Sequence, residues 1–481
     1  MSRRAGARRV TALGFALALL VTAGCGQKAG VNTMYAGPGG TAAQAGQLAG
    51  GDGFGGAGAG ASGDLGGLGG GGGASDGGSL GKSGGSLGGN GTTGGDPQNP
   101  GGQSLPPGTA PPPGQGDTTG VTADTIKIGV HAPVTGASAL SQGTFERAVG
   151  TYFAAVNRAG GINGRKVEVI FEDDGFDPNR ARSVCKKLAE QDEVFLLIGG
   201  AGADQIDACA RYAAAIGVPY LSAGVHETRP GLGPLANLST YFALSLTYEQ
   251  QVPLLAKLVK SQFGGQNVAV VVADNDSLDN FFAKAASAVK GVAGDNLVLS
   301  RRIPKNTAAE AASVGTNICQ SGAKVVLWNA SPSSLINVSK AMACQVTFIG
   351  PGLTNGLNIV ATGACPAVDG ALFYSPFPGM DVMRQDKAFV SAYQSKNNAS
   401  PDDIGAAIYG MEKLVGTMLQ ATGKDLSRES FMATIARVKT FDSGVYPPTS
   451  FTSRFGGTAM HLLQADCGKR EYVTVRRNER P

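Results

Sequence analysis

Short apolar runs alternate with amphipathic segments between about residues 125 and 475. Runs rich in Val, Ile, Leu and Phe are typical of buried strands, whereas apolar residues at helical spacing are typical of helices that cover a sheet. In the first half of this region the pattern predicts strands at 126–130, 166–171, 194–198 and 218–222, with helices at 143–159, at 178–188 and over the residues that end at 216. This alternation indicates a parallel sheet with right-handed crossovers.

The same alternation restarts after Tyr248. It predicts a helix at 249–263 and strands at 267–273, 324–328, 346–349 and 370–374. Roughly 350 residues are too many for one small hydrophobic core, so two α/β domains are expected.

Local signals mark the ends of several elements. Asp177-Pro178 is typical of a helix start, with the Asp as N-cap and the Pro at the first helical position. Loops rich in small residues follow the first, third and fourth predicted strands. In open parallel sheets, ligands bind beyond the carboxyl ends of the strands. The sequence therefore predicts that these loops form a binding site.

The first 24 residues predict an export signal. Its basic part contains Arg3, Arg4, Arg8 and Arg9. The apolar stretch Val10–Val21 that follows is too short to span a bilayer. Small residues then precede Cys25, which resembles a bacterial lipobox, although Thr22 stands where Leu is usual. The resemblance implies that Cys25 carries a lipid and anchors an extracytoplasmic protein to the cell membrane. The alternative is an ordinary signal peptide that contains a cysteine.

Residues 25–120 are dominated by Gly, Ala, Ser and Pro, and residues 69–73 are all glycine. Such a segment has too few apolar side chains to offset the entropy cost of ordering it, so a disordered linker is predicted. The linker is either a flexible stalk between the lipid and the folded part or a low-complexity tract with no length requirement.

The charge and the cysteines narrow the class of protein. The chain carries +4, and loss of the four signal arginines leaves 36 basic against 36 acidic residues, so no nucleic-acid partner is expected. Apart from Cys25 the chain has six cysteines, together with three histidines and no CxxC pair, so neither a metal site nor a cofactor is expected.

An even number of cysteines in an oxidising compartment predicts three disulfides. We favour the pairs Cys185–Cys209, Cys319–Cys344 and Cys365–Cys467 among 15 possibilities, because the first two would tie neighbouring strand–helix units; free buried thiols are the alternative.

Several segments together carry a more specific pattern. They are Ile126-Lys127-Ile128-Gly129, Ala159-Gly160-Gly161-Ile162-Asn163-Gly164-Arg165-Lys166, Glu172-Asp173-Asp174, Val218-Pro219-Tyr220-Leu221-Ser222 and Phe348-Ile349-Gly350-Pro351. Over about residues 125–475 the chain resembles the periplasmic binding proteins of the branched-chain amino-acid (Leu/Ile/Val) type, which serve ABC transporters.

The resemblance implies the type I periplasmic-binding-protein fold, an α/β fold of two Rossmann-like lobes with parallel sheets and a three-crossing hinge. The N-terminal lobe would hold residues 125–245 and 375–446, and the C-terminal lobe residues 246–374 and 447–478. The lobes would close on a small polar, amino-acid-like ligand, which a membrane permease and its ATPase would then accept. The alternative is a receptor of the same fold that reports its ligand to a membrane signalling partner.

Family position also implies which residues contact the ligand. They are Gln142 in the first loop, Gly202, Ala203 and Asp204 in the second, and Gly224 and His226 in the third. An Asp204 carboxylate would repel a ligand carboxylate, and its alternative role is a helix N-cap before Gln205.

The second half of the chain departs from the family pattern. Asn275–Asp279 stands where a Tyr-Gly is frequent, and Gly352 stands where amino-acid binders place the acid that pairs with the ligand ammonium. Thr354 follows in that loop as a candidate contact. Trp328 is the single Trp, and it forms either an aromatic wall of the cleft or part of the core.

Enzyme motifs are absent from the sequence. There is no GxSxG, HExxH or P-loop, and His131, His226 and His461 have no Ser or Cys partner nearby in sequence. We therefore expect a receptor without catalytic residues.

Overall fold

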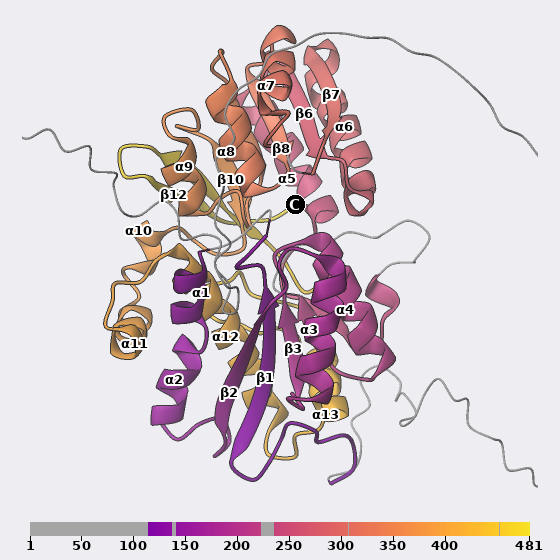
Figure 1. The fold of residues 1–481 in the computed structure, drawn as a ribbon, viewed down its shortest axis with the longest axis vertical. Helices are drawn as coiled ribbons and strands as arrows, with labels where there is room; N and C mark the ends of the chain where they lie inside the picture. The colour runs from indigo at the N-terminus through magenta and orange to yellow at the C-terminus, as the bar shows by residue number, and fades with distance from the viewer. Residues whose placement is uncertain (1–113, 137–140, 223–234, 306, 452) are drawn as a thin grey trace, which may run out of the picture. The chain divides into compact units, whose positions relative to one another are not determined.

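The computed structural model describes residues 114–136, 141–222, 235–305, 307–451 and 453–481. Cys25 and most of the expected linker lie outside these residues. Within them, no helix is long and apolar enough to cross a bilayer. Two sheets organise this part of the chain, and helices cover both (Figure 1). We call each sheet with its helices a lobe.

The sheet of the first lobe has five parallel strands in the order β2-β1-β3-β4-β5. They are β1 (Thr125–Ala132), β2 (Lys166–Asp173), β3 (Leu196–Gly199), β4 (Tyr220–Ser222) and β5 (Tyr241–Ala243). Successive side chains of a strand point to opposite faces, so Leu196 and Leu197 enter two different hydrophobic clusters. The four strands predicted for this half of the chain are confirmed, and β5 is an addition.

Helices cover both faces of this sheet. They are α1 (Gln142–Ala148), α2 (Thr151–Arg158), α3 (Pro178–Glu190), α4 (Ala203–Ala215), η1 (Leu235–Asn237), α10 (Met380–Met383), α11 (Lys387–Asn397), α12 (Asp403–Thr422) and α13 (Arg428–Arg437). The predicted start of α3 is confirmed, because the Asp177 side chain accepts a hydrogen bond from the Arg180 N–H and Pro178 is the first helical residue.

The prediction of one continuous helix over 143–159 is wrong. Gly150 adopts a left-handed conformation with φ 77° and separates α1 from α2. The carboxylate of Glu412 on α12 accepts hydrogen bonds from the backbone N–H groups of Gly150 and Tyr152. This contact between segments distant in sequence satisfies the donors that the break exposes, and no local pattern records it.

The sheet of the second lobe has seven strands in the order β12-β11-β10-β9-β8-β6-β7. They are β6 (Val268–Ala273), β7 (Leu297–Ile303), β8 (Val325–Asn329), β9 (Thr347–Pro351), β10 (Leu372–Ser375), β11 (Met460–Asp466) and β12 (Glu471–Glu479). The first five of these are parallel, whereas β11 and β12 form an antiparallel hairpin at one edge. The four predicted strands are confirmed; β7, β11 and β12 were not predicted.

The helices of the second lobe are η2 (Asp276–Leu278), η3 (Gly294–Asn296), α5 (Tyr248–Gln262), α6 (Asp279–Ala293), α7 (Ala311–Gln320), α8 (Pro332–Ala341) and α9 (Asn358–Ala364). A capping box between Thr247 and Gln250 starts α5 directly after the chain leaves the first sheet. Such a box satisfies two backbone donors reciprocally and fixes where the helix begins.

The chain passes between the two sheets three times: between β5 and α5, after β10, and before β11. The last passage comes late. Phe451 packs against Phe242, and the Gly456 N–H donates to the Ala243 carbonyl. Residues up to 456 therefore accompany the first sheet, several positions beyond the expected boundary at 447.

Three disulfides join the pairs favoured from the sequence. Cys185–Cys209 links α3 to α4 in the first lobe. Cys319–Cys344 links the last turn of α7 to the residues just after α8, and Cys365–Cys467 links the end of α9 to the turn of the β11–β12 hairpin. Each disulfide lies within one lobe, so none of the three restrains the lobes against each other.

Candidate ligand-binding site

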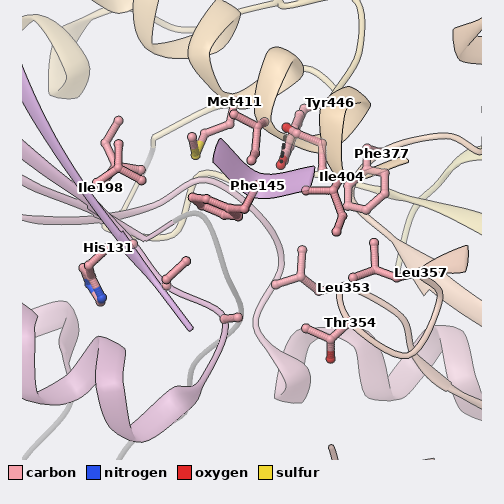
Figure 2. Close-up of a pocket in the computed structure, with 17 residues that line it drawn as sticks. His131, Phe145, Ile198, Leu353, Thr354, Leu357, Phe377, Ile404, Met411 and Tyr446 are labelled. Carbon is pink, nitrogen blue, oxygen red and sulfur yellow. Dashed lines mark hydrogen bonds between the residues drawn. The ribbon is translucent and has the colours of Figure 1, made fainter. Parts of the chain in front are cut away.

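A cavity of about 90 Å³ lies at the carboxyl ends of β1 and β3, the edge where open parallel sheets bind ligands (Figure 2). It is of the same order as the ~150 Å³ apolar cavity that holds a benzene molecule. Helices α1 and α12 and the segment between β9 and α9 complete its walls. The lining residues are Val130, His131, Ala132, Phe145, Ile198, Gly199, Gly200, Ala201, Leu353, Thr354, Leu357, Phe377, Ile404, Ala407, Ile408, Met411 and Tyr446.

The walls are almost entirely apolar. Aromatic and aliphatic side chains come from both lobes, among them Phe145 from α1, Ile404 and Met411 from α12, and Leu353 and Leu357 from the segment after β9. Among the residues that the structure describes, no Asp, Glu, Lys or Arg lines the cavity. This lining suits the apolar body of a small molecule, since binding pockets are mostly apolar with a few polar groups that orient the ligand.

Few polar groups face this space. Thr354 contributes a hydroxyl, and the Tyr446 hydroxyl donates to the Ala407 carbonyl at 3.3 Å. The backbone of Gly199, Gly200 and Ala201 forms another part of the wall, immediately before the N-terminus of α4. Backbone N–H groups at a helix N-terminus attract anions, so this side of the cavity is the one nearest to a favourable field for negative charge.

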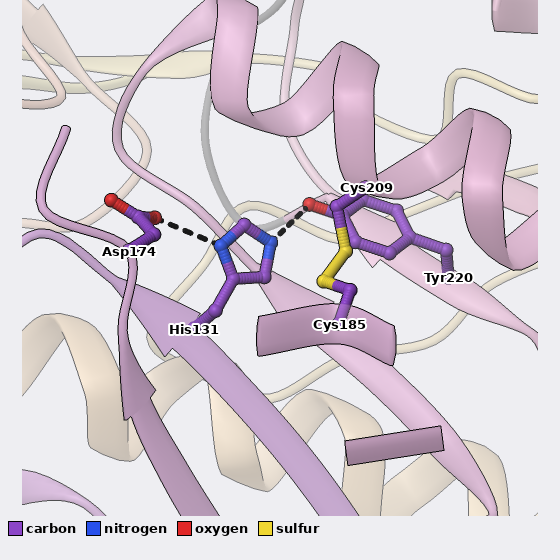
Figure 3. The surroundings of a disulfide bond; sticks show 5 residues. All are labelled: His131, Asp174, Cys185, Cys209 and Tyr220. Carbon is purple, nitrogen blue, oxygen red and sulfur yellow. Dashed lines mark hydrogen bonds and ion pairs between the residues drawn. A yellow bond between two sulfur atoms is a disulfide. The ribbon is translucent and has the colours of Figure 1, made fainter. Parts of the chain in front are cut away.

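His131 lies beside the cavity but does not offer its ring to a ligand. Its Nδ1–H donates to Asp174 at 2.9 Å, and its Nε2 accepts from the Tyr220 hydroxyl at 2.8 Å (Figure 3). The three residues are fully buried, and burial raises the pKa of Tyr220 well above its usual value, which keeps the hydroxyl a donor. In Figure 2 the imidazole points away from the apolar side chains.

The same imidazole supports the backbone of Gly199, Gly200 and Ala201, which we call the glycine wall. A Cβ added to Gly199 would lie 2.0 Å from Nε2 of His131, so only glycine fits directly over the ring. The Sγ atoms of Cys185 and Cys209 lie within 4.8 Å of a His131 nitrogen. Both sulfurs are joined in a disulfide, so the group is structural and not a metal site in this state. The strand predicted from the sequence ended at residue 130, one residue before His131, and the sequence gave no signal for these partners.

Asp204 lies at the start of α4 and contacts the second lobe. Its Oδ1 accepts a hydrogen bond from the Ser277 hydroxyl at 2.7 Å, and its Oδ2 accepts from Asn275 at 3.0 Å and Lys305 at 2.8 Å. The alternative role of Asp204 as a helix N-cap is wrong, because Gly202 is the N-cap of α4 and Asp204 is its second residue.

Two buried carboxylates stand behind the cavity walls. Burial raises the pKa of Glu412 to about 8, and its carboxylate holds the junction of α1 and α2. Burial also raises the pKa of Asp403 to about 6, and its Oδ2 accepts from the Asn358 N–H, next to Leu357 in the cavity wall. Both carboxylates therefore fix backbone that positions lining residues.

A family model described as periplasmic binding protein matches residues 125–469. The chain belongs to the periplasmic binding protein family. Its architecture, with two mainly parallel sheets and three connecting passages, is that of the type I members, so the expected family and fold class are confirmed. Members of this family are extracytoplasmic ligand binders and not enzymes.

This binding protein is distantly similar to curated relatives. An amino acid binding protein of Pseudomonas aeruginosa is 29% identical over 215 residues, which cover 44% of this chain and 55% of that protein. The chain thus spans about half the length of the curated relatives it matches.

Solved structures agree on the fold. A solute-binding protein of an ABC transporter from Rhodopseudomonas palustris, in complex with benzoate, has a TM-score of 0.61 at 17% identity and covers 73% of this chain and 96% of its own. A branched-chain amino acid transporter substrate-binding protein from Streptococcus pneumoniae, in complex with isoleucine, has a TM-score of 0.60 at 20% identity and covers 73% and 100%.

Of the expected contact residues that the structure describes, Thr354 alone lines the cavity. Gln142 is exposed at the start of α1 and donates to Glu146, while Gly202 and Ala203 begin α4 just beyond the glycine wall. Gly224 and His226 lie outside the described residues.

Trp328 is part of the core of the second lobe. It is fully buried, it stands edge-on to Phe348, and it does not line the cavity. The structure thus agrees with the core role and places no Trp in the cavity wall. The signal that could have separated the two roles is the strand itself, since β8 is central in its sheet and both of its faces are covered.

The departure at Gly352 has a steric reason. A Cβ at this position would lie 2.7 Å from the Cβ of Phe373 and 2.8 Å from the Tyr374 carbonyl oxygen. The backbone here is also held, since the Gly352 N–H donates to that carbonyl. No acidic side chain fits in this backbone, so this binding protein has no partner for a ligand ammonium at that position.

Proposed function

We propose that this chain is the extracytoplasmic solute-binding protein of an ABC importer, and that its ligand is a small carboxylic acid with an aromatic or branched apolar body. The cavity lined by Phe145, Leu357, Ile404 and Met411 carries the proposal. A membrane permease and its ATPase would accept the loaded protein. The expected polar ligand is thereby replaced by an apolar one with a single polar end.

The side of the cavity nearest to α4 suits a carboxylate. The backbone from Gly199 to Gly202 leads into α4, whose N-terminus attracts negative charge. The negative charge of Asp204 near this point is balanced by Lys305. A ligand ammonium would meet no acidic side chain among the described lining residues, and burying an unpaired charge is costly. The benzoate complex of the Rhodopseudomonas palustris protein is consistent with such a ligand.

A thermal-shift screen tests the ligand class. We expect benzoate and 4-hydroxybenzoate at about 100 times their dissociation constant to stabilise the protein by about 2.7 kcal/mol, which raises the melting temperature of a chain of this size by about 4 °C. Glutamate serves as a polar control and should give no shift. Stabilisation by isoleucine alone would restore the amino-acid assignment, and no shift with any carboxylic acid would contradict the proposed ligand.

Lipid anchoring through Cys25 is part of the proposed function. The basic and apolar residues before Cys25 and the Gly-rich residues after it support a lipoprotein whose binding lobes are tethered to the membrane. A Cys25→Ser chain is expected to appear in the medium or the soluble fraction, while the native chain stays with the membranes. Equal membrane association of both chains would show that the lipid is not the anchor.

A further inference from the structure

The Asp204 carboxylate receives donors from two separate segments of the second lobe. Asn275 and Ser277 belong to the turn after β6, and Lys305 follows the end of β7. Asp204 itself belongs to α4, whose Ile206 and Cys209 pack under the sheet of the first lobe. We call these four residues, Asp204, Asn275, Ser277 and Lys305, the interlobe latch.

The second lobe holds the latch donors in place before they meet Asp204. The Asn275 side chain accepts a hydrogen bond from the Ser277 N–H at 2.9 Å, and the Asn275 carbonyl accepts from Arg302 at 2.8 Å. Ser277 is 1% exposed. Because these groups are fixed within their own lobe, little side-chain entropy is lost when they contact Asp204.

The charged part of the latch is unevenly exposed. The Asp204 side chain is 11% exposed, whereas that of Lys305 is 53% exposed. A nearly buried carboxylate with three donors loses much more when its partners leave than an exposed ion pair does. The latch should therefore depend mainly on Asp204 and its neutral donors, and less on Lys305.

The latch lies close to the cavity along the chain. Asp204 comes three residues after Ala201 in the glycine wall, while the segment with Leu353, Thr354 and Leu357 connects β9 and α9 of the second lobe. The relative placement of the lobes therefore decides whether both parts of the cavity wall meet. In the ligand-free chain, contacts of the protein itself must supply the free energy for that placement.

We propose that Asp204 and Lys305 are positioning residues that hold the two lobes together around the cavity before a ligand arrives. The latch keeps a larger fraction of the free protein in the binding-competent arrangement. Apparent affinity scales with that fraction, so a broken latch weakens binding without removing any residue that lines the cavity. The effect on ligand affinity rests on the proposed function, whereas the effect on lobe placement does not.

Pulsed EPR on the ligand-free mature chain tests the latch directly. Spin labels attached to unnatural amino acids at the exposed positions Lys186 and Lys290, one in each lobe, leave the disulfides intact. We expect Asp204→Asn to broaden and lengthen the distance distribution and Lys305→Met to do so less. The matched control is Lys187→Met, which removes a lysine paired with Glu172 and Asp192 inside the first lobe. An Asp204→Asn distribution equal to that of the unmodified chain would overturn the proposal.

Calorimetry with benzoate provides the second readout. Asp204→Asn should weaken benzoate binding about tenfold and Lys305→Met about threefold, and the double variant should bind about as weakly as Asp204→Asn alone, because the pair acts as one unit. Lys187→Met should bind normally. Weakened binding with an unchanged EPR distribution would contradict the latch, since the loss would then be local. If the unmodified chain does not bind benzoate, the proposed ligand class fails while the EPR result still decides the latch.

Discussion

Ala407→Phe is expected to reduce the affinity for benzoate by about 100-fold or more. Ala407 lines the cavity from α12, and a phenyl group attached there would occupy the space of about 90 Å³ that the ligand ring needs. Burial of one aromatic ring contributes about 1.5–3 kcal/mol, and each 1.4 kcal/mol is a factor of ten in affinity. Loss of that burial together with the steric conflict accounts for the expected size of the effect.

The stability of the ligand-free variant separates blockage from misfolding. Filling an apolar cavity without forcing its walls apart stabilises a fold by about 0.5–2 kcal/mol, so the melting temperature should stay level or rise. Ala421→Phe is the matched control, because Ala421 is an exposed residue of the same helix. Unchanged benzoate affinity in Ala407→Phe, measured by calorimetry, would show that the ligand binds elsewhere.

The sequence was a good guide to the periodic elements. Strands such as β6 and β8 are nearly continuous apolar runs because both faces of a parallel sheet are covered, and the alternation of such strands with helices along the chain predicts the fold class. The start of α3 was equally predictable, since Asp177 and Pro178 act within one helical turn. These features depend on interactions that are local in sequence or on burial alone.

The edge strands of the second sheet were harder to predict from the sequence. Strand β12 contains Arg476, Arg477 and Glu479, and β7 contains Arg301 and Arg302, so neither strand has a long apolar run. Both strands lie at sheet edges, where one side faces solvent and charged residues are tolerated. Their apolar pattern is too short to be separated from that of a loop.

The cavity could not be predicted because its walls come from distant parts of the chain. Phe145, Leu357 and Ile404 are ordinary core residues by pattern, and only the folded chain brings them around one space. Family position did locate the loops near Thr354 and Asp204, yet it could not show that Asp204 is occupied by donors of the second lobe. Hydrogen bonds across 70 to 100 residues leave no periodic trace in a sequence.

Glu412→Gln is expected to remove a fall in stability that the native protein shows between pH 6.5 and 8.5. Burial raises the pKa of Glu412 to about 8 in the folded chain, whereas a glutamate in an unfolded chain ionises near 4.3. The folded protein thus keeps a proton that the unfolded chain has released, so its stability decreases as the pH rises from about 4.3 to about 8 and levels off above pH 8. At about 1.36 kcal/mol per pKa unit, the full decrease from about pH 4.3 upward is about 5 kcal/mol for this fully buried group, and about 2 kcal/mol of it falls above pH 6.5.

Asp403 nearly completes its change below that window, and the change of His461 has the opposite sign, because an unfolded histidine binds its proton up to about pH 6.5. The pKa of Asp403 is raised by burial to about 6, and that of His461 is lowered by burial to about 4. Around Glu412 itself, the facing groups are Lys396 on α11, whose pKa is lowered by burial, and the hydroxyls of Tyr152 and Tyr409, whose pKa values are raised by burial. A lysine whose pKa is lowered by folding makes stability rise with pH, so Lys396 opposes the fall. The tyrosines stay neutral below pH 8.5, so the fall above pH 6.5 belongs to Glu412.

Urea unfolding, measured at intervals from pH 5 to pH 9, tests this prediction. We expect the curves of unfolding free energy against pH for the native chain and for Glu412→Gln to cross. A glutamine keeps one carbonyl acceptor for the N–H of Gly150 or Tyr152 but turns an amide donor toward the other, which costs about 1–3 kcal/mol. Glu412→Gln should therefore be less stable than the native chain at pH 5 and equal or more stable at pH 8.5. Glu146→Gln, which removes an exposed carboxylate from α1, should follow the native curve. Parallel curves for Glu412→Gln and the native chain would mean that Glu412 is ionised in the fold throughout this range, with the two N–H donors and Lys396 as sufficient partners for its charge.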